Sequence, residues 1–205
     1  MEERFISIWE GAKPYLNTRS NDRHTLYCYY FAEQLLASYP DADETVVLSA
    51  MILHDVGWST VPEDKQLLSF GPHMQYPELR RQHEIEGVRI ASEILQSLGY
   101  AENIIGAVSA IIDGHDTRKE SHSIEDAIVR DADKLWRYTD FGLETLATWF
   151  NFTTEQQMDL LAKWIETRFF TDVGRAMARG LYGYMVVKQN LLPLPINRGG
   201  SKKGQ

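Results

Sequence analysis

The segment ETVVLSAMILHDVG, residues 44–57, decides the fold of this chain. It is apolar on almost every side from Val46 to Leu53, and a helix without a polar face usually lies at the centre of a protein. We therefore expect a central helix from Glu44 to about Leu53. His54 and Asp55 follow it, just before a turn glycine, so an imidazole and a carboxylate stand together at the buried end of the helix.

The sequence on either side of this segment also has the helical period. Apolar residues recur at three- and four-residue steps from Leu26 to Leu36, with Asn21-Asp22 as candidate caps and Tyr39-Pro40 as the end. Asp43 is expected to cap the central helix, and hairpin signals are absent. Further helices are expected over 77–98, over 101–112, from a cap at Ser123 onward and, in two or three pieces, over 142–192.

These patterns predict an all-α protein, a helical bundle in one domain. The chain has 205 residues, and a domain typically has roughly 150. The domain is expected to span 1–192, with the C-terminal helices included. Residues 193–205 are rich in Gly, Pro and polar residues, so we interpret them as a tail outside the core.

The stretch from Gly57 to Tyr76 interrupts the helical pattern with prolines and a glycine. A connection this long is uncommon in a compact domain unless it is functional or contains a short helix. Its aromatic residues Trp58, Phe70 and Tyr76 make it a candidate lid or base-stacking wall. An ordinary surface connection with anchoring aromatics is the alternative interpretation.

The charge of the chain limits its partners. Lys and Arg number 21 and Asp and Glu 29, which gives a net charge of −8. Binding to nucleic-acid polymers or to anionic membranes generally needs a basic surface, so neither is expected. The single cysteine, Cys28, excludes an internal disulfide. No apolar run reaches the ~18 residues of a spanning helix, and the start lacks the regions of a secretory signal, so a cytoplasmic location is expected.

Histidines and acidic residues supply candidate metal ligands at helix ends and within apolar helices. Imidazole and carboxylate suit divalent ions such as Mn, Fe, Co, Ni and Zn. Each has a plainer interpretation: a single histidine is more often a core or surface residue, Asp131 can pair with a neighbouring arginine, and Cys28 is a small buried residue or a soft ligand. The candidates are His24, His54, Asp55, His83, His115 and Asp131, whereas His73 and His122 lie in expected loops.

The order of these residues resembles the HD-domain superfamily of metal-dependent phosphohydrolases, from about Arg23 to Tyr138. The resemblance is carried by AMILHDVG at 50–57, QHEIEGV at 82–88, GHD at 114–116 and DADKL at 131–135. It implies an all-α bundle with a metal site in the centre. The implied metal ligands are His24, His54, Asp55 and Asp131.

The resemblance also implies further site residues. His83 and His115 match positions that bind a second metal or contact the phosphate, and catalysis is assigned to them together with Asp55. Many members have a lysine, often assigned to phosphate stabilisation, where this chain has Trp58. Residues that could contact the substrate instead are Lys134, Arg80, Arg81 and Trp58 itself.

The favoured hypothesis is hydrolysis of a small phosphate ester, such as a nucleotide, by a metal-activated water. The expected cofactor is a divalent transition metal (Mn, Fe, Co, Ni or Zn), as one or two ions. Two alternatives stay open: a di-iron oxygenase acting on a small polar substrate, and a non-catalytic metal or ligand sensor. The expected partner is a small-molecule phosphate substrate, and a homodimer is the further assembly considered. Gly180 and Gly183 would allow close helix contact at a partner surface of the C-terminal helices, with core packing within the monomer as the alternative.

Overall fold

The computed structural model describes residues 1–189, so the tail expected at 193–205 lies outside the described residues. Within 1–189 the chain is helical and contains no strand, which confirms the all-α prediction. The α-helices are α1 (Glu3–Ala12), α2 (Asn21–Leu36), α3 (Glu44–Leu53), α4 (Glu63–Gln66), α5 (Pro77–Ser97), α6 (Glu102–Ile112), α7 (Ile124–Leu135), α8 (Asp140–Phe150), α9 (Thr154–Thr167) and α10 (Asp172–Lys188).

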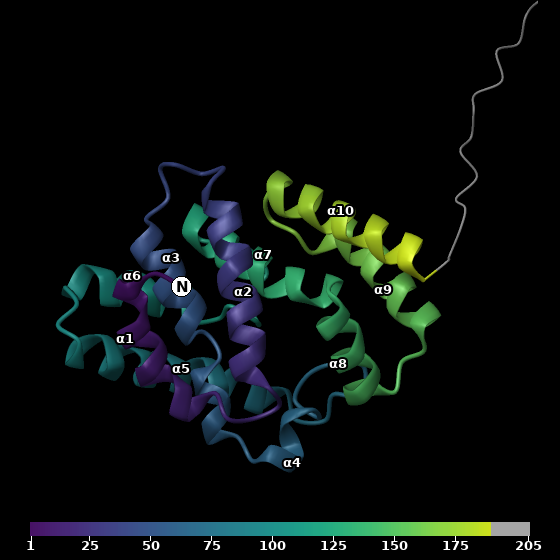
Figure 1. Cartoon of the computed structure of the whole chain (residues 1–205). Helices are drawn as coiled ribbons and strands as arrows, with labels where there is room; N and C mark the ends of the chain where they lie inside the picture. Colours follow the sequence, from purple (N-terminus) through teal and green to yellow (C-terminus); the bar gives the residue numbers. More distant parts are fainter. Residues whose placement is uncertain (190–205) are drawn as a thin grey trace, which may run out of the picture.

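Helix α3 forms the centre of the bundle, as its apolar sequence predicts. All residues from Val46 to Leu53 are buried, and α3 packs against α1, α2, α6 and α7. Figure 1 shows α8, α9 and α10 (green to yellow) gathered beside α2 and α7, away from α1, α5 and α6. The end of α3, where His54 and Asp55 follow, is therefore surrounded by other helices.

The observed helix caps agree with the predicted ones at two helix starts and differ at a third. Asp43 accepts hydrogen bonds from Thr45 N and Val46 N, and the Ser123 hydroxyl accepts one from Asp126 N, as predicted. The start of α2 is different: Asn21 is already helical, and the N-cap is Ser20, in a left-handed conformation and without a side-chain cap bond. The expectation that Asn21-Asp22 caps this helix is therefore wrong.

The segment after Asp55 is built into the bundle. It forms a short 3-10 helix, η2 (Val56–Thr60), followed by α4, and η2 packs closely against α5. Gly57 makes this packing possible, because a Cβ atom there would lie 1.9 Å from the His83 carbonyl oxygen. Trp58 is 2% exposed, so this part of the connection is core rather than surface.

The C-terminal helices number three within the described residues, as expected, although the first begins at Asp140 rather than at Gly142. Helix α1 was not foreseen from the helical period. None of the described helices is both long and apolar enough to cross a membrane.

Candidate metal centre

Three helices bring histidine and carboxylate groups together at the end of α3. His24 lies on α2, His54 follows α3 and Asp133 lies on α7. The Nε2 atoms of His24 and His54 are 3.1 Å apart. Asp133 Oδ1 lies 3.4 Å from His24 Nε2 and 3.7 Å from His54 Nε2, so the three side chains form a cluster that could hold a metal ion.

Asp55 joins this cluster to a second group of side chains. Its Oδ2 lies 3.5 Å from His24 Nε2, and its Oδ1 lies 3.6 Å from His115 Nε2 and 4.0 Å from His83 Nε2. Asp116 completes the second group, with Oδ2 3.8 Å from His83 Nε2. His83 lies on α5, while His115 and Asp116 follow α6. One carboxylate therefore faces two adjacent clusters.

The hydrogen bonds of the histidines fit metal ligands. The Nδ1 atoms of His54 and His115 donate to the carbonyl oxygens of Met51 and Ile112, at 2.8 and 2.9 Å. Because a carbonyl oxygen only accepts, Nδ1 of each ring carries a proton, and Nε2 is the nitrogen that faces the carboxylates. Both ring nitrogens of His83 are buried and have no hydrogen-bond partner among the described residues. Buried carboxylates need a cation to balance their charge, and either protonated imidazoles or a metal ion bound by the Nε2 atoms would supply it.

The pKa values reflect burial opposed by these charges. Burial lowers the pKa of His24 and of His83 to about 4, so both are neutral at pH 7 and free to coordinate. Burial also disfavours charge on His115, but a hydrogen bond to Asp55 and the charge of Asp116 outweigh it and raise its pKa to about 9. The centre thus attracts positive charge even in the core.

Asp131 is not part of the cluster, which corrects the sequence-based choice of ligand. Its Oδ1 accepts a hydrogen bond from Phe170 N at 2.9 Å, and its Oδ2 accepts from Thr171 N and Thr171 Oγ1, each at 2.8 Å. The Thr171 hydroxyl in turn caps α10. Asp131 therefore anchors the start of α10, and Asp133 occupies the position toward His24 and His54.

The residues expected to contact substrate divide into two groups. Trp58 is in the centre: its ring stacks on that of His83 with centroids 4.0 Å apart, and its Nε1 donates to Asp55 Oδ1 at 3.1 Å. Arg80 lies at the edge, with Nη2 3.3 Å from Asp116 Oδ1. Lys134 and Arg81 do not reach the clusters, because Lys134 donates to the Arg130 carbonyl and Arg81 pairs with Glu84 and Asp113.

Sequence reasoning missed Asp133 and Asp116, although both lie within the strings that carried the resemblance. Glu84 fixes the loop that holds Asp116: its fully buried carboxylate accepts hydrogen bonds from Asp116 N at 2.9 Å and from Thr117 N and Oγ1, each at 2.8 Å. Cys28 is buried, with Sγ 3.5 Å from His24 Nδ1 and 3.7 Å from His24 Nε2, and it belongs to none of the candidate metal-binding groups among the described residues.

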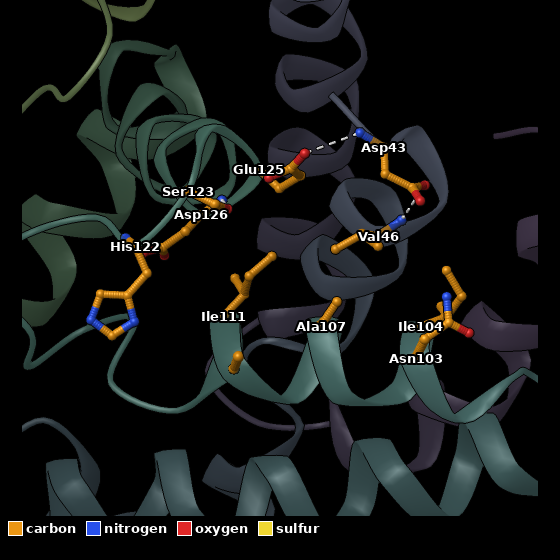
Figure 2. A pocket seen from close by; sticks show the side chains of 11 residues that line it. Asp43, Val46, Asn103, Ile104, Ala107, Ile111, His122, Ser123, Glu125 and Asp126 are labelled. Atoms are coloured by element: carbon orange, nitrogen blue, oxygen red, sulfur yellow. Dashed lines mark hydrogen bonds between the residues drawn. The ribbon is translucent and has the colours of Figure 1, made fainter. Parts of the chain in front are cut away.

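A hollow of about 400 Å³ lies elsewhere, against α6 and the starts of α3 and α7 (Figure 2). Asp43 and Glu125 meet across it through a hydrogen bond from Asp43 N to Glu125 Oε1 at 3.2 Å. His122 stands at its rim. None of the clustered histidines or aspartates lines it, so the buried clusters are the better candidate for chemistry.

The fold and the clusters together define a helical domain with buried histidine–carboxylate clusters that could hold a metal ion. A family model for the HD domain matches residues 21–138, more than half of the chain, and the chain therefore belongs to the HD domain family. HD domains bind divalent metals, in agreement with the donors assembled here.

A solved structure shares the fold. It comes from an uncultured Thermotogales bacterium and is described as a predicted HD superfamily hydrolase. The similarity covers 92% of this chain and 91% of that chain, with a TM-score of 0.62 and 20% sequence identity. No curated protein matches the chain significantly.

Proposed function

We propose that this protein is a metal-dependent phosphohydrolase that acts on a small phosphate ester, such as a nucleotide. The observation that carries the proposal is the pair of adjacent histidine–carboxylate clusters joined through Asp55. The description of the solved neighbour as an HD superfamily hydrolase supports hydrolysis. The resemblance of the motifs to HD phosphohydrolases supports a phosphate ester as the substrate.

The clusters provide ligands for one or two divalent transition-metal ions. His24, His54 and Asp133 would hold the first ion with Asp55, and His83, His115 and Asp116 would hold the second. When bound, such an ion lowers the pKa of a water molecule and offsets the charge of phosphoryl oxygens.

The protein's own side chains would position the reactants. Asp55 lies between the clusters, and the Trp58 N–H donates to its Oδ1, so its Oδ2 would accept a hydrogen bond from a water molecule in the site. Where they are not ligands, His83 and His115 would donate to the phosphate or protonate the leaving oxygen. Arg80, held by Asp116, adds positive charge at the edge of the centre.

Metal analysis and phosphatase assays test this proposal. The purified chain is stripped with a chelator and reloaded separately with Mn, Fe, Co, Ni or Zn, and phosphate release is measured from p-nitrophenyl phosphate and a panel of nucleotides. His54→Ala and Asp55→Ala should each lower activity at least about a hundredfold, as loss of essential metal or acid–base groups does. The matched controls His73→Ala and His122→Ala change exposed histidines outside the clusters and should keep full activity.

The outcomes separate the alternatives. Full activity in the chelated protein, or in both cluster variants, would refute a metal-dependent hydrolase. Two irons per chain with oxygen consumption and no phosphate release would point to the oxygenase. Tight metal binding with no turnover of any kind would point to a sensor.

A further inference from the structure

Arg19 lies two positions before the first residue of α2 and has an uncommon backbone conformation. Its φ angle is 49° and that of the next residue, Ser20, is 60°. Residues other than glycine rarely adopt the left-handed region, and such strained conformations concentrate at functional sites. The two residues lie immediately before α2, the helix that carries His24.

The Arg19 guanidinium is enclosed by aromatic rings. Its carbon lies 4.5 Å from the centroid of Trp58, 5.1 Å from that of Phe70 and 5.4 Å from that of Trp149. Its Nε donates to Gln66 Oε1. Gln66 also donates to the carbonyl oxygens of Trp58 and Val61, so one buried amide ties Arg19 to the segment that follows Asp55.

The Nη2 group of Arg19 has no hydrogen-bond partner within residues 1–189. The Nη2 atom is buried and makes no hydrogen bond, although a guanidinium normally uses its donors when it is withdrawn from water. Arg19 also has no carboxylate within ion-pair distance among the described residues. Arg19 as a whole is half-buried, and a guanidinium with a free donor is a candidate binding group for an anion.

Arg19 lies beside the metal centre. It stacks on Trp58, and Trp58 contacts both His83 and Asp55. Burial lowers the pKa of Arg19 to about 10, and the charges of Asp55 and Asp116 oppose that effect. The guanidinium is therefore charged at neutral pH and within electrostatic reach of both clusters.

We propose that Arg19 is a substrate-binding residue whose Nη2 donates to an anionic oxygen of the phosphate ester. It supplies the positive charge that the position of Trp58 lacks in this chain, because it stacks directly on that ring. Trp58, Phe70 and Trp149 hold the guanidinium plane, so its donors are oriented before the substrate arrives. This inference rests on the proposed function.

Phosphate binding to the metal-loaded protein tests the role of Arg19. Inorganic phosphate is titrated by calorimetry into the wild type, Arg19→Gln and Arg19→Lys, and KM and kcat are measured with p-nitrophenyl phosphate. Arg23→Gln is the matched control, because Arg23 also stacks on an aromatic ring, that of Phe141 at 4.5 Å, but is exposed. Metal content and the thermal midpoint are measured for every variant.

Arg19→Gln should weaken phosphate binding and raise KM at least about tenfold, since hydrogen bonds to charged groups are among the strongest. Arg19→Lys keeps the charge without the planar fork, so its affinity should fall between those of the wild type and Arg19→Gln. Metal content should not change in either variant. Arg23→Gln should match the wild type.

Unchanged phosphate affinity and KM in both Arg19 variants, with the wild type active, would overturn the role of Arg19 and leave the proposed function intact. If the wild type neither binds phosphate nor hydrolyses any phosphate ester, the proposed function fails and this inference fails with it. Weaker phosphate binding accompanied by an equal loss of metal would show that Arg19 only supports the fold of the centre, which also overturns the inference.

Discussion

Asp133 Oδ1 lies 3.4 Å from His24 Nε2, whereas both oxygens of Asp131, two residues earlier on α7, accept hydrogen bonds from residues 170 and 171. The two carboxylates lie on opposite sides of α7 and have different partners. Asp133 adds negative charge to the clusters at the end of α3. Asp131 fastens α10 to the bundle.

This division predicts different losses for two matched variants. Asp133→Asn should bind metal at least about tenfold more weakly, because changes around a metal ligand commonly cost that much or more. Asp131→Asn should keep its metal and lose about 1–3 kcal/mol of unfolding free energy. The amide NH2 group of asparagine would face the N–H and O–H donors of Phe170 and Thr171, which now donate to the carboxylate. Metal titration and urea unfolding check the pair. Loss of metal in Asp131→Asn alone would contradict the assignment.

The sequence could not decide between these aspartates. Residues two apart on a helix point about 200° apart, so only one of them can face α2 and α3. Both belong to a helix with an apolar face, and the period gives no preference. The choice depends on where α10 packs, and the threonine that captures Asp131 is forty positions away.

The other differences between the predictions and the structure have the same cause, because they too depend on residues that are far apart in the sequence. Helices α3, α5 and α6 are encoded by local apolar periods, caps and breakers, and their boundaries were predicted to within a residue or two. Arg19 acquires its surroundings only when Trp58, Phe70 and Trp149 assemble around it from three separate segments. Local patterns indicate which elements form, whereas the partners of a single side chain depend on the tertiary fold.

The second cluster predicts the stoichiometry of bound metal. His115 Nε2 lies 3.6 Å from Asp55 Oδ1, and His115 also groups with His83 and Asp116. We expect His115→Ala to lose one of two bound ions and to retain the other, because the first cluster keeps its donors. Elemental analysis after dialysis measures the ratio of metal to protein. An unchanged ratio would show that His115 contacts substrate or water rather than metal.

We expect that adding one methyl group at Gly57 lowers the stability of the protein strongly. A Cβ at this position would lie 1.9 Å from the His83 carbonyl oxygen and 2.5 Å from Gly87 N. Backbone atoms cannot move aside cheaply, so Gly57→Ala should cost about 3 kcal/mol or more of unfolding free energy. The metal centre should loosen as well, since Gly57 follows Asp55 closely and packs under His83.

Gly106→Ala is the matched control for this change. Gly106 lies inside α6, is exposed, and has nothing within 4 Å of an added Cβ. Alanine there should raise stability by about 0.5–1 kcal/mol, because glycine is a poor helix former. Urea unfolding of both variants measures the difference. A Gly57→Ala protein as stable as the wild type would mean that η2 does not pack on α5 as closely as described.

The buried hydroxyl of Tyr138, which lies outside the histidine–carboxylate clusters, should make the stability of the protein depend on pH. Its hydroxyl donates to the Leu161 carbonyl at 2.9 Å in the core, and burial raises its pKa above the usual 10.0. The folded protein therefore holds this proton more tightly than the unfolded chain. The contribution of the Tyr138 hydroxyl to the unfolding free energy is fully present below pH 10 and is lost as the pH rises further. Above pH 10 the tyrosine ionises in the unfolded chain, whereas it stays protonated in the folded protein.

We therefore expect Tyr138→Phe to cost about 1 kcal/mol at pH 8, through the lost hydrogen bond. Between pH 10 and 11 the advantage of the wild type should shrink by about 1 kcal/mol, since one pH unit corresponds to ~1.4 kcal/mol per proton. Urea unfolding at pH 8, 10 and 11 measures this change, with Tyr184→Phe, whose residue is 61% exposed, as the control. A difference between wild type and Tyr138→Phe that is constant over this range would show that the phenol is not buried in solution.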